Sequence, residues 1–198
     1  MHRNDGHPSP LILALGDSLT AGHGLERHES FAAQLERELR KTMPDTAVIN
    51  AGVSGDTSAG ALRRLPDLLS SLRQRPQLAV VELGANDVLR RVPAAHLKAN
   101  LETIIEELGR CGIPSLLATI EPPAFLGHLL GDYGSVFPAV AARFGLKTCR
   151  FFPEGVLGHP AMVLADRVHP NARAISMCAA AVAPHVLSAL DTPNVQAA

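Results

Sequence analysis

Residues 11–22, with the sequence LILALGDSLTAG, decide the fold of this chain. Five apolar residues in a row are followed by Gly16 and the polar pair Asp17 and Ser18, and Gly22 comes shortly afterwards. Such a run predicts a buried β-strand that ends in a tight turn. Ligands of open parallel sheets bind beyond the carboxyl ends of the strands, so the hydroxyl of Ser18 lies where chemistry is expected. Ser18 is equally suited to capping a helix, which is the purely structural interpretation.

Short apolar runs alternate with helical patterns along the rest of the chain. Phe31, Leu35 and Leu39, for example, recur at the four-residue spacing of one helical face. Strands are expected at residues 11–15, 47–50, 78–83, 115–120 and 146–152, and helices at 31–41, 57–72 (interrupted or restarted at Pro66), 94–108, 136–144 and 172–190. This alternation predicts an α/β protein of three layers, with a parallel sheet covered by helices on both faces.

Composition limits the classes of partner that the protein can have. The 198 residues are 46% hydrophobic and 19% charged, and the formal net charge is -1. Without a dense basic stripe, neither nucleic acid nor an anionic membrane surface is an expected partner. No repeat or linker divides the chain, so residues 1–198 are expected to form a single domain, with frayed tails at 1–9 and 191–198.

No signal-peptide pattern precedes the first strand, and no apolar run of membrane-spanning length is evident. We therefore expect a cytoplasmic protein without stable membrane association, although a removed secretory leader would leave the same sequence. Cys111, Cys149 and Cys178 are odd in number and lack CxxC spacing, which predicts free thiols. The nine histidines show no ligand spacing such as HExxH, so we expect no metal and no cofactor.

Two further polar turns follow the second and third predicted strands. The first is NAGVSGDT at residues 50–57, and the second is GAND at 84–87. Each can be explained as a turn that caps a helix. If the first three strands lie in the order 2-1-3, however, Ser18, Gly52 and Asn86 face one crevice. A hydroxyl, a backbone N–H and an amide are the groups needed to attack a carbonyl and stabilise the resulting oxyanion.

A candidate general base lies in the sequence DRVHPN, residues 166–171, just before the last predicted helix. The spacing of three allows Asp166 to reach His169, and a carboxylate in that position would orient the imidazole. The structural interpretation is a solvated loop in which Asn171 caps the helix. His23 and His159 are further histidines that could contact a substrate, or lie on the surface.

Taken together, the segments GDSL at 16–19, NAG at 50–52, GAND at 84–87 and DRVH at 166–169 resemble the four sequence blocks of the SGNH (GDSL) hydrolases. The resemblance is nearest to the single-domain bacterial branch of thioesterase I, lysophospholipases and arylesterases. It implies a flavodoxin-like fold with strand order 2-1-3-4-5 and ester hydrolysis through an acyl-enzyme. Arg91 and the loop that begins at Glu121 depart from the pattern of that branch, at the expected substrate mouth.

The resemblance also implies roles for individual residues. Ser18 would be the nucleophile, His169 the general base and acid, and Asp166 its orienting partner. The N–H groups of Ser18 and Gly52, with the amide of Asn86, would form the oxyanion hole.

The expected substrates are short- to medium-chain acyl or aryl esters, or thioesters. The apolar residues after the fourth strand form either a wall for the acyl group or a loop that folds onto the core. The substrate-binding candidates are Asp17, Phe125, Leu126, Leu129 and Phe137. A carbohydrate O-acetyl esterase and a non-catalytic ligand-binding module are alternatives. Phosphoryl transfer through Asp17 is a weaker one, since the acidic residues of a magnesium site are missing.

Overall fold

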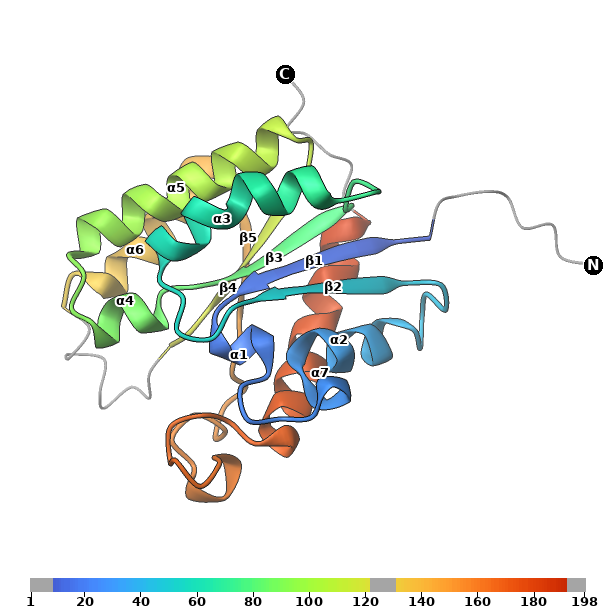
Figure 1. The fold of residues 1–198 in the computed structure, drawn as a ribbon, viewed down its shortest axis with the longest axis vertical. Coiled ribbons are helices and arrows are strands. Elements are labelled where there is room, and N and C mark those ends of the chain that lie inside the picture. The colour runs from blue at the N-terminus through green and yellow to red at the C-terminus, as the bar shows by residue number, and fades with distance from the viewer. Residues whose placement is uncertain (1–8, 122–130, 192–198) are drawn as a thin grey trace, which may run out of the picture.

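A five-stranded parallel sheet forms the middle layer of the structure, a computed structural model that describes residues 9–121 and 131–191 (Figure 1). The strands are β1 (Leu11–Gly16), β2 (Ala47–Gly52), β3 (Leu78–Glu82), β4 (Ser115–Thr119) and β5 (Lys147–Arg150). Their order is β2-β1-β3-β4-β5, with every neighbouring pair parallel. The predicted flavodoxin-like order is therefore confirmed, and β1 lies between the two strands whose loops carry the other polar turns.

Helices cover both faces of the sheet (Figure 1). One face carries α3 (Ser58–Ser71), α5 (Ala94–Arg110) and α6 (Tyr133–Phe144), and the other carries α2 (Phe31–Leu39) and α7 (Ala172–Leu190). The short elements are α1 (Ser18–Ala21), η1 (Arg27–Glu29), α4 (Ala85–Leu89) and η3 (Pro160–Met162). In Figure 1, α1 and α4 both lie near the carboxyl ends of the strands.

The central strands are apolar without interruption because both of their faces are buried. Ile12 and Ala14 pack into the core cluster of α2 and α7, whereas Leu13 and Leu15 pack into the cluster of α3, α5 and α6. All four side chains are fully buried. Continuous apolar runs of this kind are typical of parallel strands with helices on both sides.

The sequence misplaced several helix boundaries. A helical interruption at Pro66 was predicted, but α3 continues through this residue. Proline removes one main-chain hydrogen bond, and the burial of Ala61 and Leu65 against the sheet holds the helix together around it. The helices α1 and α4 were interpreted as turns, because four or five residues are too short to show a helical period.

Other expectations concern the ends of the chain, its cysteines and membrane spanning. The predicted frayed tails lie outside the described residues except for Ser9 and Asp191. The three cysteines are free, as predicted, and burial raises the pKa of Cys149 to about 12. Contrary to the expectation that no run reaches spanning length, α7 is long and apolar enough to cross a membrane, with a mean hydropathy of 1.4. In this structure its apolar side chains, such as Ile175 and Val182, pack into the core.

Gly52 lets α1 pack directly onto the end of β2. Gly52 is paired in register with Gly16 at the carboxyl end of β1. A Cβ atom at Gly52 would lie 2.2 Å from the backbone nitrogen of Ala21 and 2.7 Å from the carbonyl carbon of Thr20. These are backbone atoms of α1, so a side chain at this position would have to displace the helix.

We therefore expect Gly52→Ala to lower the free energy of unfolding by about 2–3 kcal/mol, because overpacking against backbone cannot be relieved by a rotamer change. Gly109→Ala is a matched control, since nothing lies within 4 Å of a Cβ there and Gly109 is in α5. It should raise the free energy of unfolding by up to about 1 kcal/mol, from helix propensity. Urea unfolding measures both, and equal effects of the two substitutions would contradict the packing argument.

Candidate active site

The end of β1 presents Ser18 at the start of α1. Asp17 is the N-cap of this helix, and its Oδ1 accepts a hydrogen bond of 2.9 Å from the N–H of Leu19. Ser18 is the first residue of the helix, so its own N–H has no partner within it. Gly22 ends the helix with a φ of 82°, a conformation that glycine adopts without strain. The predicted turn therefore holds the Ser18 hydroxyl and a free backbone N–H together.

Asp166 and His169 are joined by a hydrogen bond in the loop before α7. Asp166 Oδ2 lies 2.7 Å from His169 Nδ1, and Oδ1 accepts hydrogen bonds of 2.9 and 3.0 Å from the N–H groups of Val168 and His169. The Val168 N–H, and then the His169 side chain, hold the pKa of Asp166 at about 2, below its usual value. The ionised carboxylate favours a proton on Nδ1, which leaves Nε2 of His169 able to accept one.

Ser18 and His169 line the same cavity, although 150 positions separate them in the sequence. This cavity has a volume of about 620 Å³, and Asn86 also lines it. Among the described residues no hydrogen bond joins Ser18 Oγ to His169. Catalytic hydrogen bonds are often long in unliganded enzymes and shorten when substrate binds. The fold thus brings the predicted hydroxyl, imidazole and amide to one place.

A buried carboxylate connects the loops that follow β1 and β3. Asp17 Oδ2 accepts a hydrogen bond of 3.0 Å from Asn86 Nδ2. The Asp17 side chain is fully buried, and this burial raises its pKa from 3.8 to about 6. The hydrogen bond occupies one of the two amide hydrogens of Asn86 and leaves the other for a ligand. Asp17 is fully buried and does not line the cavity, so this structure shows it supporting Asn86 rather than facing the cavity.

Comparison with known proteins identifies the kind of site that these residues form. The model of the GDSL-like lipase/acylhydrolase family matches residues 14–174. This chain belongs to the GDSL-like lipase/acylhydrolase family. The family predicted from the four sequence blocks is thereby confirmed, and so is the enzyme class, a serine ester hydrolase.

Three similar proteins cover most of this GDSL-like chain. Esterase TesA of Pseudomonas aeruginosa is 39% identical over 160 residues, which are 80% of this chain and 79% of the relative. The arylesterase of Vibrio mimicus is 33% identical over 183 residues, or 92% and 90% of the two chains. The crystal structure of AlinE4, an SGNH-hydrolase family esterase, is 41% identical with a TM-score of 0.75, covering 94% of this chain and 99% of its own.

The geometry does not support Gly52 as an oxyanion donor in this GDSL-like enzyme. Its N–H already donates a hydrogen bond of 3.0 Å to Asn50 Oδ1. Later in the same loop, the N–H groups of Ser54 and Gly55 have no acceptor within the described part of the chain. Gly52 is needed for its missing side chain, which lets α1 pack against it, rather than for its N–H.

The cavity wall is mainly apolar and comes from elements that are distant in sequence. Of the predicted substrate-binding residues, Phe137 lines it, whereas Phe125, Leu126 and Leu129 lie outside the described residues. Sequence reasoning missed most of the wall, which includes Val88, Leu89, Ile120, Tyr133, Ala141 and Phe152. The sequence spacing could have indicated that α6 contributes to this wall, since Phe137 and Ala141 are four residues apart and share a helical face.

The two remaining candidate histidines have different surroundings. The ring of His23 lies against that of His169, with 4.2 Å between ring centroids and 36° between the planes. The Nδ1 atom of His159 instead accepts a hydrogen bond of 3.1 Å from the N–H of Ala161, so this residue caps η3. His23 is therefore part of the site, and His159 has a structural role.

The buried Asp17 makes stability depend on pH. Its pKa in the folded state, about 6, lies above the value of 3.8 expected for an unfolded chain. The contribution of Asp17 to the stability of wild type should therefore fall as pH rises from about 4 to about 6, by about 3 kcal/mol in total, and stay level above that. Asp17→Asn removes this titration. The free energy of unfolding of Asp17→Asn minus that of wild type should therefore increase between about pH 4 and about pH 6. Urea unfolding of both proteins from pH 4 to 8 measures this difference.

Asp17→Asn should also slow hydrolysis, because Leu19 and Asn86 donate to different oxygens of Asp17 and asparagine replaces one of these oxygens with an NH2 donor. We expect a fall in kcat of about tenfold or more, since a lost oxyanion donor costs about 100- to 1000-fold.

For the stability prediction, a difference in the free energy of unfolding between Asp17→Asn and wild type that does not change with pH would show that Asp17 does not titrate as described.

Proposed function

We propose that this esterase hydrolyses short- to medium-chain acyl or aryl esters through an acyl-enzyme on Ser18. The observation that carries the proposal is that Ser18 and the His169–Asp166 pair share one largely apolar cavity. The name of the Vibrio mimicus relative, arylesterase, agrees with this substrate class.

Each step of the proposed reaction has a group in place. His169 Nε2 accepts the Ser18 proton while Oγ attacks the ester carbonyl. The imidazolium then returns this proton to the leaving alcohol, and the carbon–oxygen bond of the ester breaks. A water molecule, deprotonated by the same imidazole, hydrolyses the acyl-enzyme and restores Ser18. Asp166 stabilises the imidazolium and fixes its orientation in both halves of the cycle.

We assign the oxyanion hole to the N–H of Ser18 and the amide of Asn86, with the N–H of Gly55 as third donor in place of Gly52. The Gly55 carbonyl accepts a hydrogen bond of 2.7 Å from Arg90, just after α4, the helix that carries Asn86. On the other side of this loop, Ser54 Oγ lies 3.3 Å from His23 Nδ1. The loop therefore runs between the amide side and the imidazole side of the site.

The nucleophile can be identified directly by covalent labelling. A fluorophosphonate should react with wild type and with Ser70→Ala, which alters an exposed serine on α3, but not with Ser18→Ala. Ser18→Ala should also lower kcat for p-nitrophenyl butyrate by about 10⁴-fold or more, because the covalent route is lost. Labelling of Ser18→Ala at another residue would exclude Ser18 as the nucleophile.

The α6 wall of the cavity should decide the acyl chain length. Ala141 lines the cavity, whereas its neighbour Ala142 is exposed and does not. Ala141→Leu should lower kcat/KM for p-nitrophenyl octanoate by about tenfold more than for the acetate, since a methylene group in a pocket is worth about 1–3 kcal/mol. Ala142→Leu should leave the ratio unchanged. Turnover of long-chain esters alone by wild type would contradict the proposed substrate class.

A further inference from the structure

His23 adds a third metal-binding side chain to the pair formed by Asp166 and His169. Each of the three offers one ligand atom, and these atoms lie within 4.8 Å of one another. Within residues 9–121 and 131–191 this is the only group of three or more histidine, cysteine or acidic residues arranged in this way. Residue spacing alone does not reveal this group, because His23 is separated from the other two residues by more than 140 positions.

Two imidazoles and one carboxylate match the ligand preferences of Zn²⁺. A tetrahedral zinc ion with bonds of about 2.0–2.1 Å needs ligand atoms about 3.4 Å apart, so ligand atoms within 4.8 Å of one another must approach by at most about 1.4 Å. Small side-chain rotations can supply this, since His23 and Asp166 are exposed and His169 is half-buried. With three protein ligands, the fourth position would be filled by water.

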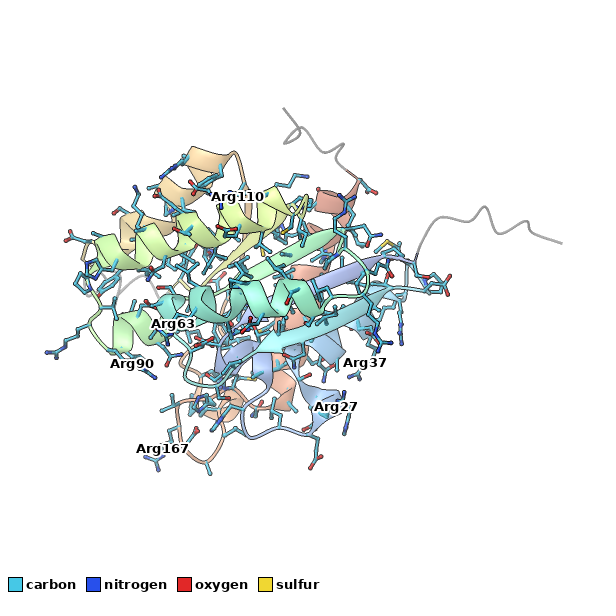
Figure 2. All side chains as sticks on the ribbon, turned by 45° about the horizontal axis from the view of Figure 1, so that its top comes forward. Arg27, Arg37, Arg63, Arg90, Arg110 and Arg167 are labelled. Carbon is cyan, nitrogen blue, oxygen red and sulfur yellow. The ribbon has the colours of Figure 1, made fainter. Side chains whose placement is uncertain are left out.

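The surroundings of the cluster also suit a cation. Ser54 Oγ lies 3.3 Å from His23 Nδ1, so it can orient this ring for binding through Nε2. Asp166 Oδ1 accepts hydrogen bonds from the N–H groups of Val168 and His169, and Oδ2 lies 2.7 Å from His169 Nδ1, so the carboxylate is held beside this imidazole. The neighbouring cation, Arg167, lies on the outer edge of its loop (Figure 2).

We propose that Zn²⁺ binds to His23, Asp166 and His169 and reversibly inhibits the esterase. The inhibition rests on the proposed role of His169 as general base. If the metal binds Nε2, it takes the lone pair that would accept the Ser18 proton. If it binds Nδ1, the ring proton must move to Nε2, which then cannot accept one. Either mode of binding stops the transfer of the proton from Ser18.

The test is a titration of the EDTA-treated full chain with zinc chloride at pH 7.5 in a buffer that does not bind metals. Two quantities are measured, the rate of p-nitrophenyl butyrate hydrolysis and the heat of Zn²⁺ binding. Zinc should abolish hydrolysis at saturation, and EDTA should restore it. His23→Gln should raise the half-inhibiting concentration at least about tenfold, relative to its own zinc-free rate, because one ligand is lost.

His185→Gln is the matched control, because His185 is exposed on α7 and lies 13 residues, about 20 Å, from the start of that helix. The zinc concentration that halves hydrolysis should be the same for His185→Gln as for wild type. His169→Gln, studied by calorimetry alone, should lose the same binding event as His23→Gln.

The proposal is overturned if wild type binds no zinc, if zinc leaves the rate unchanged or increases it, or if His23→Gln is inhibited like wild type. Failure of the proposed function gives a different result. A chain that hydrolyses no ester would refute that function, whereas the loss of binding heat in His23→Gln would still decide whether the metal site exists.

Discussion

The hydrogen bond between the buried carboxylate of Asp17 and the amide of Asn86 is the interaction on which the site depends. It joins the loops that follow two adjacent strands, β1 and β3. The same side chain caps α1, so it fixes the helix that carries Ser18 and the amide at once. Burying a carboxylate opposes folding, and the raised pKa of Asp17 reflects that cost. The protein retains the group because nothing neutral with two separate acceptor oxygens is available among the amino acids.

A second buried acid lies next to this connection. Glu82, the last residue of β3, is fully buried, and its Oε2 accepts a hydrogen bond of 2.9 Å from Thr20 Oγ1 in α1. Burial, and then the nearby charge of Asp17, raise the pKa of Glu82 well above its usual value. The helix that carries Ser18 is thus held by the carboxyl groups of Asp17 and Glu82 and by the close approach of Gly52. Few ways remain for Ser18 to move relative to the sheet.

Much of this arrangement could be predicted from the sequence, for identifiable reasons. The alternation of apolar runs and helical periods determines the layers, and the parallel sheet brings the strand ends together wherever the exact boundaries lie. The spacing of Asp166 and His169 within one loop predicts their contact, because it involves only local backbone geometry. The residues Ser18 and Asn86 directly follow buried strands and were therefore placed at the correct edge.

The errors occurred where one residue type serves two purposes. A glycine after a strand can donate its N–H or make room for a neighbour, and only the position of α1 shows that Gly52 does the second. An aspartate beside a nucleophile can face substrate or the core, and Asp17 faces the core. The contact between His23 and His169 depends on the packing of two loops, for which the sequence has no short-range signal.

The position of the acid–base pair just before α7 has a consequence for the biogenesis of the enzyme. During synthesis the chain contains Ser18 from the end of the first strand onward, whereas His169 is added about 150 residues later. α7, which packs against α2 and the sheet, follows later still. In the proposed mechanism a nascent chain cannot turn over esters before the segment that contains His169 has been added and has docked, so turnover reports the docking of that segment.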